Sequence, residues 1–443
     1  MDLDAALATV RQLFDAAVAA VDVRAAVRRS LRLEGDRLIV AGTEIALPLA
    51  PGGRLTVVAV GKAAAAMAAA AEEILGDRIT GGLAITKHGH GGPTRSIAVR
   101  KAGHPTPDEA GLAAARELAS SLAGGTPDDV VLCLISGGGS ALLTSPVDGI
   151  TLDDLRATTA ALLAAGANIN ELNAVRKHLE TLKGGGLAAV AAPASVLALV
   201  VSDVLGDPLD VIASGPTVGD TTTFADAWAV IERHGLQPSL PASVTARLQA
   251  GLRGEVPDTP RPDDPLFARV HTVVIANLRL AAEGAARRAA ELGYQPSLFD
   301  LTIEGEAREV GGQLTARARR EARQGRGQRC LIGGGETTVT VRGDGLGGRN
   351  TELALAAALE IDGLAGVALA SLATDGDDGP TGAAGAVALG DTIAQGRALG
   401  LDAADYLARN DSARYFERVG GLLVTGPTLT NVADLYCILL EGN

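Results

Sequence analysis

Apolar runs of strand length alternate with helix-length segments through the first half of the chain. Strands are expected at residues 55–60 (LTVVAV), 83–86, 130–135 (VVLCLI) and 195–201 (SVLALVV), with helices at 63–75, 109–122 and 152–165. Strands that are apolar at every position are buried on both faces, and when helices separate them they form parallel sheets. The pattern predicts an α/β fold with a parallel sheet covered by helices on both faces.

A proline-rich acidic stretch at residues 251–267 interrupts this alternation and is typical of a linker or an exposed excursion of the chain. The alternation then resumes, with strands expected at 271–276, around 297–301, at 330–341 as a strand-turn-strand, at 366–372 and near 435–440, and helices at 278–292, 307–323 and 351–360. A length of 443 residues allows two or three domains. We therefore predict an N-terminal domain at 1–250 and a C-terminal α/β domain at 268–443.

Composition excludes several classes of protein. A net charge of −13 and an aromatic content of 2% argue against nucleic-acid binding, because a polyphosphate would be repelled and base-stacking side chains are scarce. The longest apolar stretch, residues 187–201, is too short to cross a membrane, and the acidic N-terminus is no signal peptide. Cys133, Cys330 and Cys437 lie in separate apolar runs and are expected to be buried thiols. We expect a cytoplasmic protein that binds neither nucleic acid nor membrane.

A glycine-rich segment, Ser136-Gly137-Gly138-Gly139-Ser140, directly follows the apolar run at 130–135. A glycine-rich turn between a buried strand and a helix exposes backbone N–H groups where an anion can bind. The segment is therefore a candidate phosphate-binding loop, the alternative being a tight turn without a ligand. It does not complete a dinucleotide fingerprint, because Leu142 occupies the sixth position.

Lys62 follows the first apolar run and precedes an alanine-rich helix. Its ammonium is a candidate partner for a carboxylate or a transferring phosphoryl group, although a solvated lysine explains this segment equally well. Asp203 follows the run at 195–201, at the carboxyl end of a strand, where ligands bind in α/β proteins. It is a candidate general base or metal ligand; the alternative is that residues 202–220 simply form a loop.

The second half of the chain offers further candidates. Gly333-Gly334-Gly335-Glu336 follows an apolar run and is expected to form a second ligand-binding turn. Arg349 follows two glycines, Gly347 and Gly348, and its guanidinium is a candidate bidentate ligand for a phosphate group. Asp375 begins a carboxylate cluster suited to Mg²⁺, whereas a calcium loop is disfavoured because Ala386 occupies the position of the required glutamate.

Other polar residues are expected to be structural. Arg176, Lys177 and Lys183 are predicted to lie on a solvated helix face, with an anion pocket as the alternative. For His88 and His90 a structural or substrate-contacting role is favoured over metal binding, because no third ligand accompanies them. The Gly-Pro-Thr tripeptide recurs at 215, 379 and 426, where turns are expected.

Taken in order, the segments VAVGKAA, GHPTPDEAG, LISGGGSALL, NAVRKHLETLKGGGLA, SDVLGDPLDVIASGPTVGD, GGGETTVTVRGDGLGGRNTELAL, TDGDDGPTGAAGA, NDSARYF and TGPTLTNVADL resemble the class II glycerate 2-kinase family. This family combines a glycerate kinase N-terminal region with a MOFRL region. The resemblance implies a Rossmann-like N-terminal domain, a C-terminal α/β domain and an active site in the cleft between them. One departure is visible: the family's terminal motif is usually Gly-Pro-Thr-Gly-Thr-Asn, and Leu429 replaces its second glycine here.

The resemblance implies phosphorylation of D-glycerate to 2-phosphoglycerate by ATP with Mg²⁺. By motif, Lys62 and Arg349 match the family's active-site lysine and arginine, and Ser136–Ser140 match its nucleotide loop. Asp203 is expected to act as the base, Asp203 and Asp375 as metal ligands, and Gly334, Gly335 and Glu336 as further nucleotide contacts. The alternative is an NAD(P)H-dependent hydroxypyruvate reductase. A small-molecule enzyme of this kind is expected to be a monomer or a homodimer.

Overall fold

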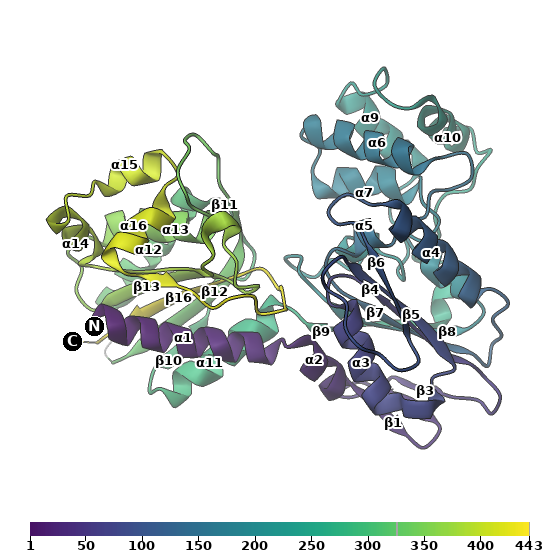
Figure 1. The fold of residues 1–443 in the computed structure, drawn as a ribbon, viewed down its shortest axis with the longest axis horizontal. Coiled ribbons are helices and arrows are strands. Elements are labelled where there is room, and N and C mark those ends of the chain that lie inside the picture. The colour runs from purple at the N-terminus through teal and green to yellow at the C-terminus, as the bar shows by residue number, and fades with distance from the viewer. Residues whose placement is uncertain (325–326, 443) are drawn as a thin grey trace. The chain divides into compact units, whose positions relative to one another are not determined.

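The computed structural model describes residues 1–324 and 327–442. The chain divides into two compact units (Figure 1). The N-terminal unit comprises Val23–Ser202 and Asp207–Ile275, and the C-terminal unit comprises Met1–Asp22, Asp203–Gly206 and Ala276–Asn443.

The N-terminal unit is built around a six-stranded sheet. Its helices are α2 (Val23–Ser30), α3 (Ala64–Leu75), α4 (Glu109–Leu122), α5 (Gly139–Leu142), α6 (Leu152–Ala164), α7 (Ile169–Lys177), α8 (Gly186–Ala191), α9 (Phe224–Arg233) and α10 (Ala242–Leu252). Its strands are β1 (Leu31–Glu34), β2 (Arg37–Val40), β3 (Ala46–Pro48), β4 (Leu55–Val60), β5 (Gly81–Lys87), β6 (Ala98–Ala102), β7 (Val130–Ile135), β8 (Ser195–Val201) and β9 (Val270–Ala276). The short strands β1, β2 and β3 form a separate antiparallel sheet.

The main sheet of this unit has the strand order β6-β5-β4-β7-β8-β9. Strands β4 to β8 pair in parallel, and β4, β7 and β8 are almost entirely buried, as their apolar sequences predict. Helix α3 packs on β4, β5 and β7, while α4 packs on β5 and β6 and α8 on β8. In chain order this arrangement is 3-2-1-4-5-6, the order of the Rossmann fold, which confirms the predicted architecture. Its topological switch point lies between β4 and β7.

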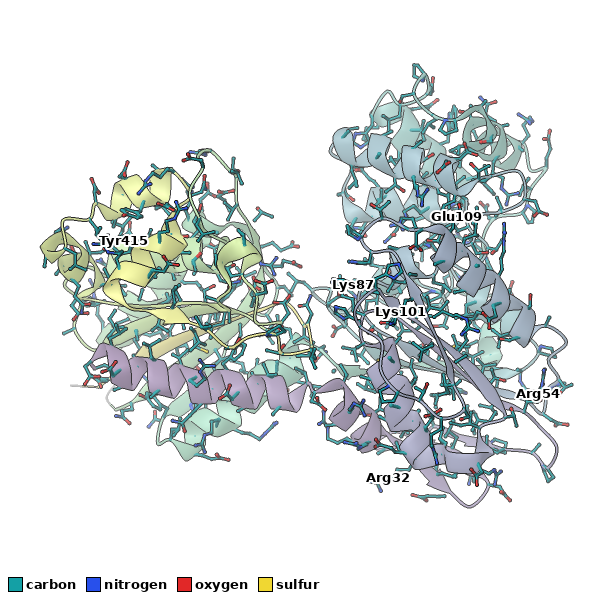
Figure 2. All side chains as sticks on the ribbon, viewed as in Figure 1. Arg32, Arg54, Lys87, Lys101, Glu109 and Tyr415 are labelled. Carbon is teal, nitrogen blue, oxygen red and sulfur yellow. The ribbon has the colours of Figure 1, made fainter. Side chains whose placement is uncertain are left out.

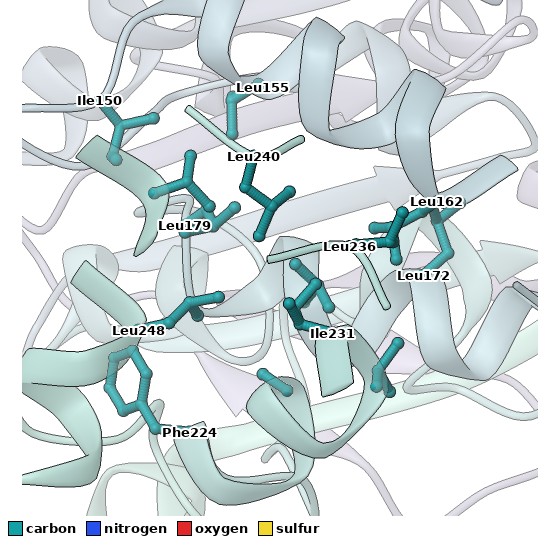
Figure 3. Close-up of a cluster of buried hydrophobic side chains, with 14 residues drawn as sticks. Ile150, Leu155, Leu162, Leu172, Leu179, Phe224, Ile231, Leu236, Leu240 and Leu248 are labelled. Carbon is teal, nitrogen blue, oxygen red and sulfur yellow. The ribbon is translucent and has the colours of Figure 1, made fainter. Parts of the chain in front are cut away.

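A helical subdomain of the same unit carries its own hydrophobic core. Helices α6, α7, α9 and α10 bury a cluster that includes Leu155, Leu172, Ile231 and Leu248 (Figure 3). Helices α6, α7 and α9 each begin with a capping box, in which side chains and backbone N–H groups satisfy one another. These helices therefore hold the end of α7, which carries Arg176 and Lys177, in a fixed position.

The C-terminal unit is a three-layer α/β structure. Its helices are α1 (Leu3–Ala20), α11 (Leu278–Glu291), α12 (Ala307–Gln324), α13 (Arg349–Ile361), α14 (Thr392–Ala398), α15 (Ala403–Ala408) and α16 (Ser412–Val419). Its strands are β10 (Gln295–Leu298), β11 (Ile303–Glu306), β12 (Arg329–Thr338), β13 (Val367–Ala373), β14 (Gly385–Leu389), β15 (Leu422–Leu423) and β16 (Asp434–Leu440). Figure 1 shows α1 and α11 on one side of the sheet and α12, α13 and α16 on the other.

The described residues of this unit form one seven-stranded sheet in the order β10-β12-β16-β13-β14-β15, with β11 also paired to β12. Strand β12 runs parallel to β10 and β11, whereas β16 is antiparallel to both β12 and β13. The predicted α/β class is confirmed, but the sheet is mixed rather than parallel.

The division into units differs from the predicted domains 1–250 and 268–443. Helix α1 belongs to the C-terminal unit because its apolar face, including Val10 and Phe14, packs on α11. The two helices approach closely at Gly284, where a Cβ would lie 2.6 Å from the Cβ of Ala20. Strand β9, expected to begin the C-terminal domain, instead completes the sheet of the N-terminal unit.

The sequence suggested that the proline-rich stretch 251–267 could be a free linker, but the structure shows that it is not. The N–H of Asp220 donates to the Pro260 carbonyl at 2.8 Å, and the Thr259 hydroxyl donates to the Asp220 carboxylate at 2.9 Å. Prolines restrict the backbone and expose their carbonyls, so this segment folds back onto its own unit. Other expectations are confirmed: Cys133, Cys330 and Cys437 are buried free thiols. Across residues 1–324 and 327–442, no helix combines the length and apolarity needed to cross a lipid bilayer.

Candidate active site

Two loops meet at the switch point of the N-terminal unit, one after β4 and one after β7. The N–H of Lys62 donates to the Gly137 carbonyl at 2.9 Å, and the N–H of Ala63 donates to the Ser136 hydroxyl at 3.1 Å. Gly61 is required here because its φ is +124° and a Cβ would lie 2.2 Å from the Ser136 Oγ. The sequence therefore brings Lys62 beside the predicted phosphate loop, at the edge where α/β folds bind ligands.

The predicted phosphate loop is a strand-to-helix turn, as expected. Gly138, with a φ of +82°, caps the short helix α5. The N–H groups of Gly137, Gly138 and Gly139 have no acceptor among the described residues. By contrast the hydroxyls of both serines have partners, since Ser136 caps α3 and Ser140 bonds to Ser214 at 2.8 Å. The backbone, rather than the serine side chains, is thus free to bind an anion.

A histidine and a lysine flank this turn. A Cβ on Gly138 would lie 3.0 Å from the Nε2 and Cδ2 atoms of His104 and 3.3 Å from the Cγ of Lys62. Burial lowers the pKa of His104 to about 4, assisted by the positive charges of Lys62, Lys87 and His90. His104 is therefore neutral at pH 7, a feature that the sequence did not indicate.

A buried polar cluster supports the glycine turn from behind, and sequence reasoning missed it. The Ser214 hydroxyl donates to the Asn173 Oδ1 at 2.9 Å, and Arg176 donates to the Ser140 carbonyl at 2.9 Å. Ala213, Ser214 and Gly215 are consecutive residues with φ of +51°, +62° and +62°. Left-handed backbone at non-glycine residues costs about 1–3 kcal/mol each and gathers at functional sites. Residues 213–215 had been predicted only as a turn.

Lys177 and Lys183 are buried, so the prediction of a solvated helix face is wrong for them. The Lys177 Nζ lies 3.2 Å from the Asp220 carboxylate and 3.5 Å from Asp210. The Lys183 Nζ donates to Glu180 at 2.7 Å and to the Leu143 carbonyl at 3.0 Å. Burial lowers the pKa of Lys183 to about 8, although Glu180 opposes that shift. Both lysines hold the loops around the turn in place. Helical periodicity alone could not show whether these lysines are buried or exposed to solvent.

Asp203 lies two residues beyond β8 and is half-buried. Its segment, Asp203–Gly206, is grouped with the C-terminal unit although the strand before it belongs to the N-terminal unit. Its predicted roles as base and metal ligand remain predictions.

Arg349 is the first residue of α13 and forms a bidentate ion pair with Asp434 in the C-terminal unit. Its Nε and Nη2 donate to the Asp434 carboxylate at 2.6 and 2.9 Å, and its Nη1 lies 3.0 Å from Glu336. Asp434 is fully buried, and burial raises its pKa to about 6 although the guanidinium opposes that shift. About a third of the Arg349 side chain remains exposed. Asp434 was missed because it precedes the apolar run of β16 without any local motif.

The second glycine run does not form the predicted ligand-binding turn. Gly333, Gly334 and Gly335 lie inside β12, paired on one side with β16, and all three are buried. A Cβ on Gly333 would lie 2.2 Å from the Phe299 ring, and one on Gly335 would lie 1.9 Å from the Ile303 carbonyl. These glycines admit neighbouring chain segments, which accounts for their presence without a ligand. Glu336, also predicted to contact nucleotide, is exposed and faces Arg349.

The carboxylate cluster that begins at Asp375 divides into different environments. Asp378 is buried and caps α13, since the N–H groups of Asn350 and Thr351 donate to its carboxylate at 2.9 and 2.8 Å. Asp375 is half-buried, and its Oδ1 accepts the N–H of Asp377 at 3.1 Å. Within residues 1–324 and 327–442, no group of three or more His, Cys, Asp or Glu side chains is placed to hold a metal ion. A Mg²⁺ site here would rest on one or two carboxylates with substrate oxygens, as is usual for this ion.

Leu429 occupies a backbone conformation that favours glycine. Its φ is +64° and its side chain is 80% exposed. The neighbouring N–H of Thr428 donates to the Asp375 carbonyl at 3.0 Å, so this loop borders the carboxylate cluster. Leu429 therefore replaces the expected glycine at a position where a glycine would relieve backbone strain.

The fold and these residues define a class: an α/β protein of two units, one of which places a lysine beside a glycine turn at a Rossmann-type switch point. Comparison with known proteins then gives the family. Residues 9–249 match a domain of unknown function, DUF4147, and residues 329–434 match the MOFRL family. The chain belongs to the glycerate 2-kinase family that combines these two regions.

Full-length relatives support this assignment. The chain is 42% identical over 435 residues to the glycerate 2-kinase of Pyrococcus horikoshii, covering 97% of this chain and 96% of the relative. It is 41% identical over 436 residues to a putative hydroxypyruvate reductase of Agrobacterium vitis, covering 97% and 94%. The crystal structure of a glycerate kinase from Thermotoga maritima matches with a TM-score of 0.88 at 38% identity, covering 99% of this chain and all of that one.

Proposed function

We propose that this protein transfers the γ-phosphoryl group of ATP to the 2-hydroxyl of D-glycerate, giving 2-phosphoglycerate. The observation that carries the proposal is the switch point of the N-terminal unit, where the Lys62 side chain adjoins three backbone N–H groups that have no acceptor within residues 1–324 and 327–442. Such a site binds a phosphate chain and stabilises charge on a transferring group. The matches to glycerate kinases along the whole chain support the choice of substrate.

In the proposed mechanism the chain positions charge and moves one proton. The N–H groups of Gly137–Gly139 bind phosphate oxygens of the nucleotide, and Lys62 stabilises the transferring phosphoryl group. Arg349 does the same through its partly exposed guanidinium, whose Nη1 faces Glu336, and Asp434 acts as a positioning residue. Asp203 accepts the proton of the 2-hydroxyl as that oxygen attacks the γ-phosphorus.

The residues present suit Mg²⁺. Asp375 and Asp203 offer half-buried carboxylate oxygens at strand ends, the ligand type that Mg²⁺ prefers. When bound, the ion would neutralise charge on the phosphate oxygens. The second glycine run is left out of the nucleotide site, because its glycines are occupied by neighbouring side chains and backbone.

A reductase using NAD(P)H is the second candidate, since one relative is named a putative hydroxypyruvate reductase. The structure disfavours it. In Rossmann dinucleotide sites the glycine-rich turn follows the first strand of the sheet. Here the turn after the first strand, β4, consists of Gly61, Lys62 and Ala63, and the glycine run follows the fourth strand, β7.

One assay distinguishes the two. Purified protein is mixed with D-glycerate and MgATP, and separately with hydroxypyruvate and NADH, while ADP release and nicotinamide absorbance are followed. Glycerate-dependent ADP release supports the kinase, and NADH oxidation without ADP release would overturn it. Phosphorus NMR of the product then decides between the 2- and 3-phosphate. Lys62→Met provides the inactive control, with unfolding measurements to show that it folds.

We also propose that the protein works in the cytoplasm, as a monomer or homodimer, without nucleic-acid or membrane partners. The net charge of −13 supports the exclusion of nucleic acid. Sedimentation equilibrium at several concentrations would test the oligomeric state, and a larger assembly would contradict it.

A further inference from the structure

Lysine is scarce in this chain and unevenly placed. Only five of its 39 Lys and Arg residues are lysine, and all five fall between residues 62 and 183. Lysine and arginine are not interchangeable, because an ammonium is a compact point charge whereas guanidinium is a planar fork. Arginine also occurs in this range, for example at Arg78, Arg100 and Arg156, so the placement of the individual lysines decides what they can bind.

Three of these lysines lie at one edge of the sheet in the N-terminal unit. Lys62 follows β4, Lys87 ends β5, and Lys101 is next to last in β6, where it pairs with Thr86 beside Lys87. Lys87 and Lys101, labelled in Figure 2, lie at the ends of neighbouring strands, and because Lys101 pairs with Thr86 their side chains leave the sheet on opposite faces. The carboxyl ends of β4, β5 and β6 therefore carry three positive charges in a protein whose net charge is −13.

The positive charge of this cluster is not neutralised by the protein. In the part of the chain that the structure describes, Lys62, Lys87, Lys101 and His90 form no ion pair. His88, by contrast, already bonds to the Asp108 carboxylate at 2.9 Å. A cluster of unpaired cations at a ligand-binding edge attracts an anion.

His104 lies within this cluster and is poised to respond to an anion. Its ring lies against Gly138 beside the Lys62 stem, and no described residue hydrogen-bonds to it. Burial and the charges of Lys62, Lys87 and His90 hold its pKa at about 4. An anion bound among these cations would offset their charge, so the pKa of the imidazole would rise.

We propose that Lys87 and His104, together with Lys62, form the subsite for the carboxylate of the acceptor acid, and that His104 binds a proton more readily when this carboxylate is bound. The arrangement of the sheet favours the acceptor over the nucleotide. The glycine turn, suited to phosphates, follows β7 on one side of Lys62, whereas His104, Lys87 and Lys101 lie toward β5 and β6 on the other. A carboxylate held there places its neighbouring hydroxyl beside Lys62. The inference rests on the proposed kinase function.

The first test is histidine NMR of the wild-type protein, with the His104 signal assigned by its loss in His104→Gln. Saturating D-glycerate without nucleotide is expected to raise the His104 pKa by more than one unit. MgATP alone is expected to raise it less, because its phosphates would bind the glycine turn and Lys62 but not Lys87. An unchanged pKa with D-glycerate would overturn the proposal. A larger rise with MgATP alone than with D-glycerate would overturn the acceptor assignment and give the cluster to nucleotide phosphates.

The second test is kinetic. His104→Gln and Lys87→Met are each expected to raise the KM for D-glycerate at least tenfold while leaving the KM for ATP within twofold. His88→Gln, a histidine of the same loops that is already paired, is the matched control and should leave both constants unchanged. An unchanged KM for D-glycerate in an active His104→Gln enzyme would contradict the subsite. Wild-type protein that binds D-glycerate through His104 but releases no ADP would instead contradict the kinase function alone.

Discussion

Gly138→Ala is expected to lower both activity and stability, and the loss of activity should exceed what the backbone strain alone would cause. The alanine would adopt a φ of +82°, and this left-handed conformation costs an L-residue about 1–2 kcal/mol. Its Cβ would also lie 3.0 Å from the His104 ring and 3.3 Å from the Lys62 Cγ, so both side chains must shift by a few tenths of an ångström. Catalytic groups displaced on this scale lose efficiency steeply, about 100-fold for 1 Å. We expect kcat/KM for D-glycerate to fall at least tenfold, and the free energy of unfolding by about 2 kcal/mol.

Gly149→Ala separates the two contributions. Gly149 lies in the same unit with a φ of +85°, and no atom lies within 4 Å of the position of its Cβ. Its alanine variant should therefore lose about 1–2 kcal/mol of stability from backbone strain but retain its kinetic constants. Urea unfolding and steady-state ADP release on both variants provide the comparison. Equal activity in the two variants would refute the placement of Lys62 and His104 against the glycine turn.

Three further predictions concern buried charge and backbone strain. Because burial raises the folded pKa of Asp434 from 3.8 to about 6, kcat should fall as the pH drops through about 6. The folded state favours this protonation, so the free energy of unfolding should not fall over the same range. A pH profile of kcat checks the prediction, since Asp434→Asn should have a low kcat that does not change with pH. Lys183→Met should lower the free energy of unfolding by about 3–5 kcal/mol, because Glu180 would stay buried without the Lys183 ammonium. Adding Glu180→Gln should restore much of this stability, and additive losses of the two variants in urea unfolding would disprove the coupling of the two residues. Leu429→Gly should raise stability by less than about 1 kcal/mol, since relief of the left-handed strain exceeds the added entropy of the unfolded chain, and a lower unfolding midpoint would contradict that.

The sheet of the N-terminal unit could be predicted closely from sequence. Residues 55–60, 130–135 and 195–201 are strands within the expected bounds, because a strand buried on both faces is apolar throughout and ends in glycine or polar residues. The membership of α1 and β9 could not be predicted. Amphipathic periodicity tells which face of α1 is buried but not which unit covers it, and an apolar strand can add to either sheet.

The site was predictable where chemistry requires a particular backbone and hidden where it depends on distant partners. Lys62 and the glycine turn were found because strand, glycine and helix are consecutive in the sequence. Asp434 and Ser214 were missed because their partners, Arg349 and Ser140, lie 85 and 74 residues away in the chain. Burial of Lys177 was missed for the same reason, since Asp220 lies 43 residues further on.

The two glycine triplets show why a motif cannot be interpreted without its surroundings. Both follow apolar runs, yet Gly137–Gly139 form a turn whose N–H groups lack acceptors in the described part of the chain, and Gly333–Gly335 continue a buried strand. The absence of a Cβ serves different needs in the two places. At the first it allows a positive φ and leaves room beside His104, and at the second it admits Phe299 and the backbone of Ile303. Only the first leaves backbone groups for a ligand, so the phosphate-binding role is proposed for residues 137–139, whereas mutations at Gly333 or Gly335 should act through stability.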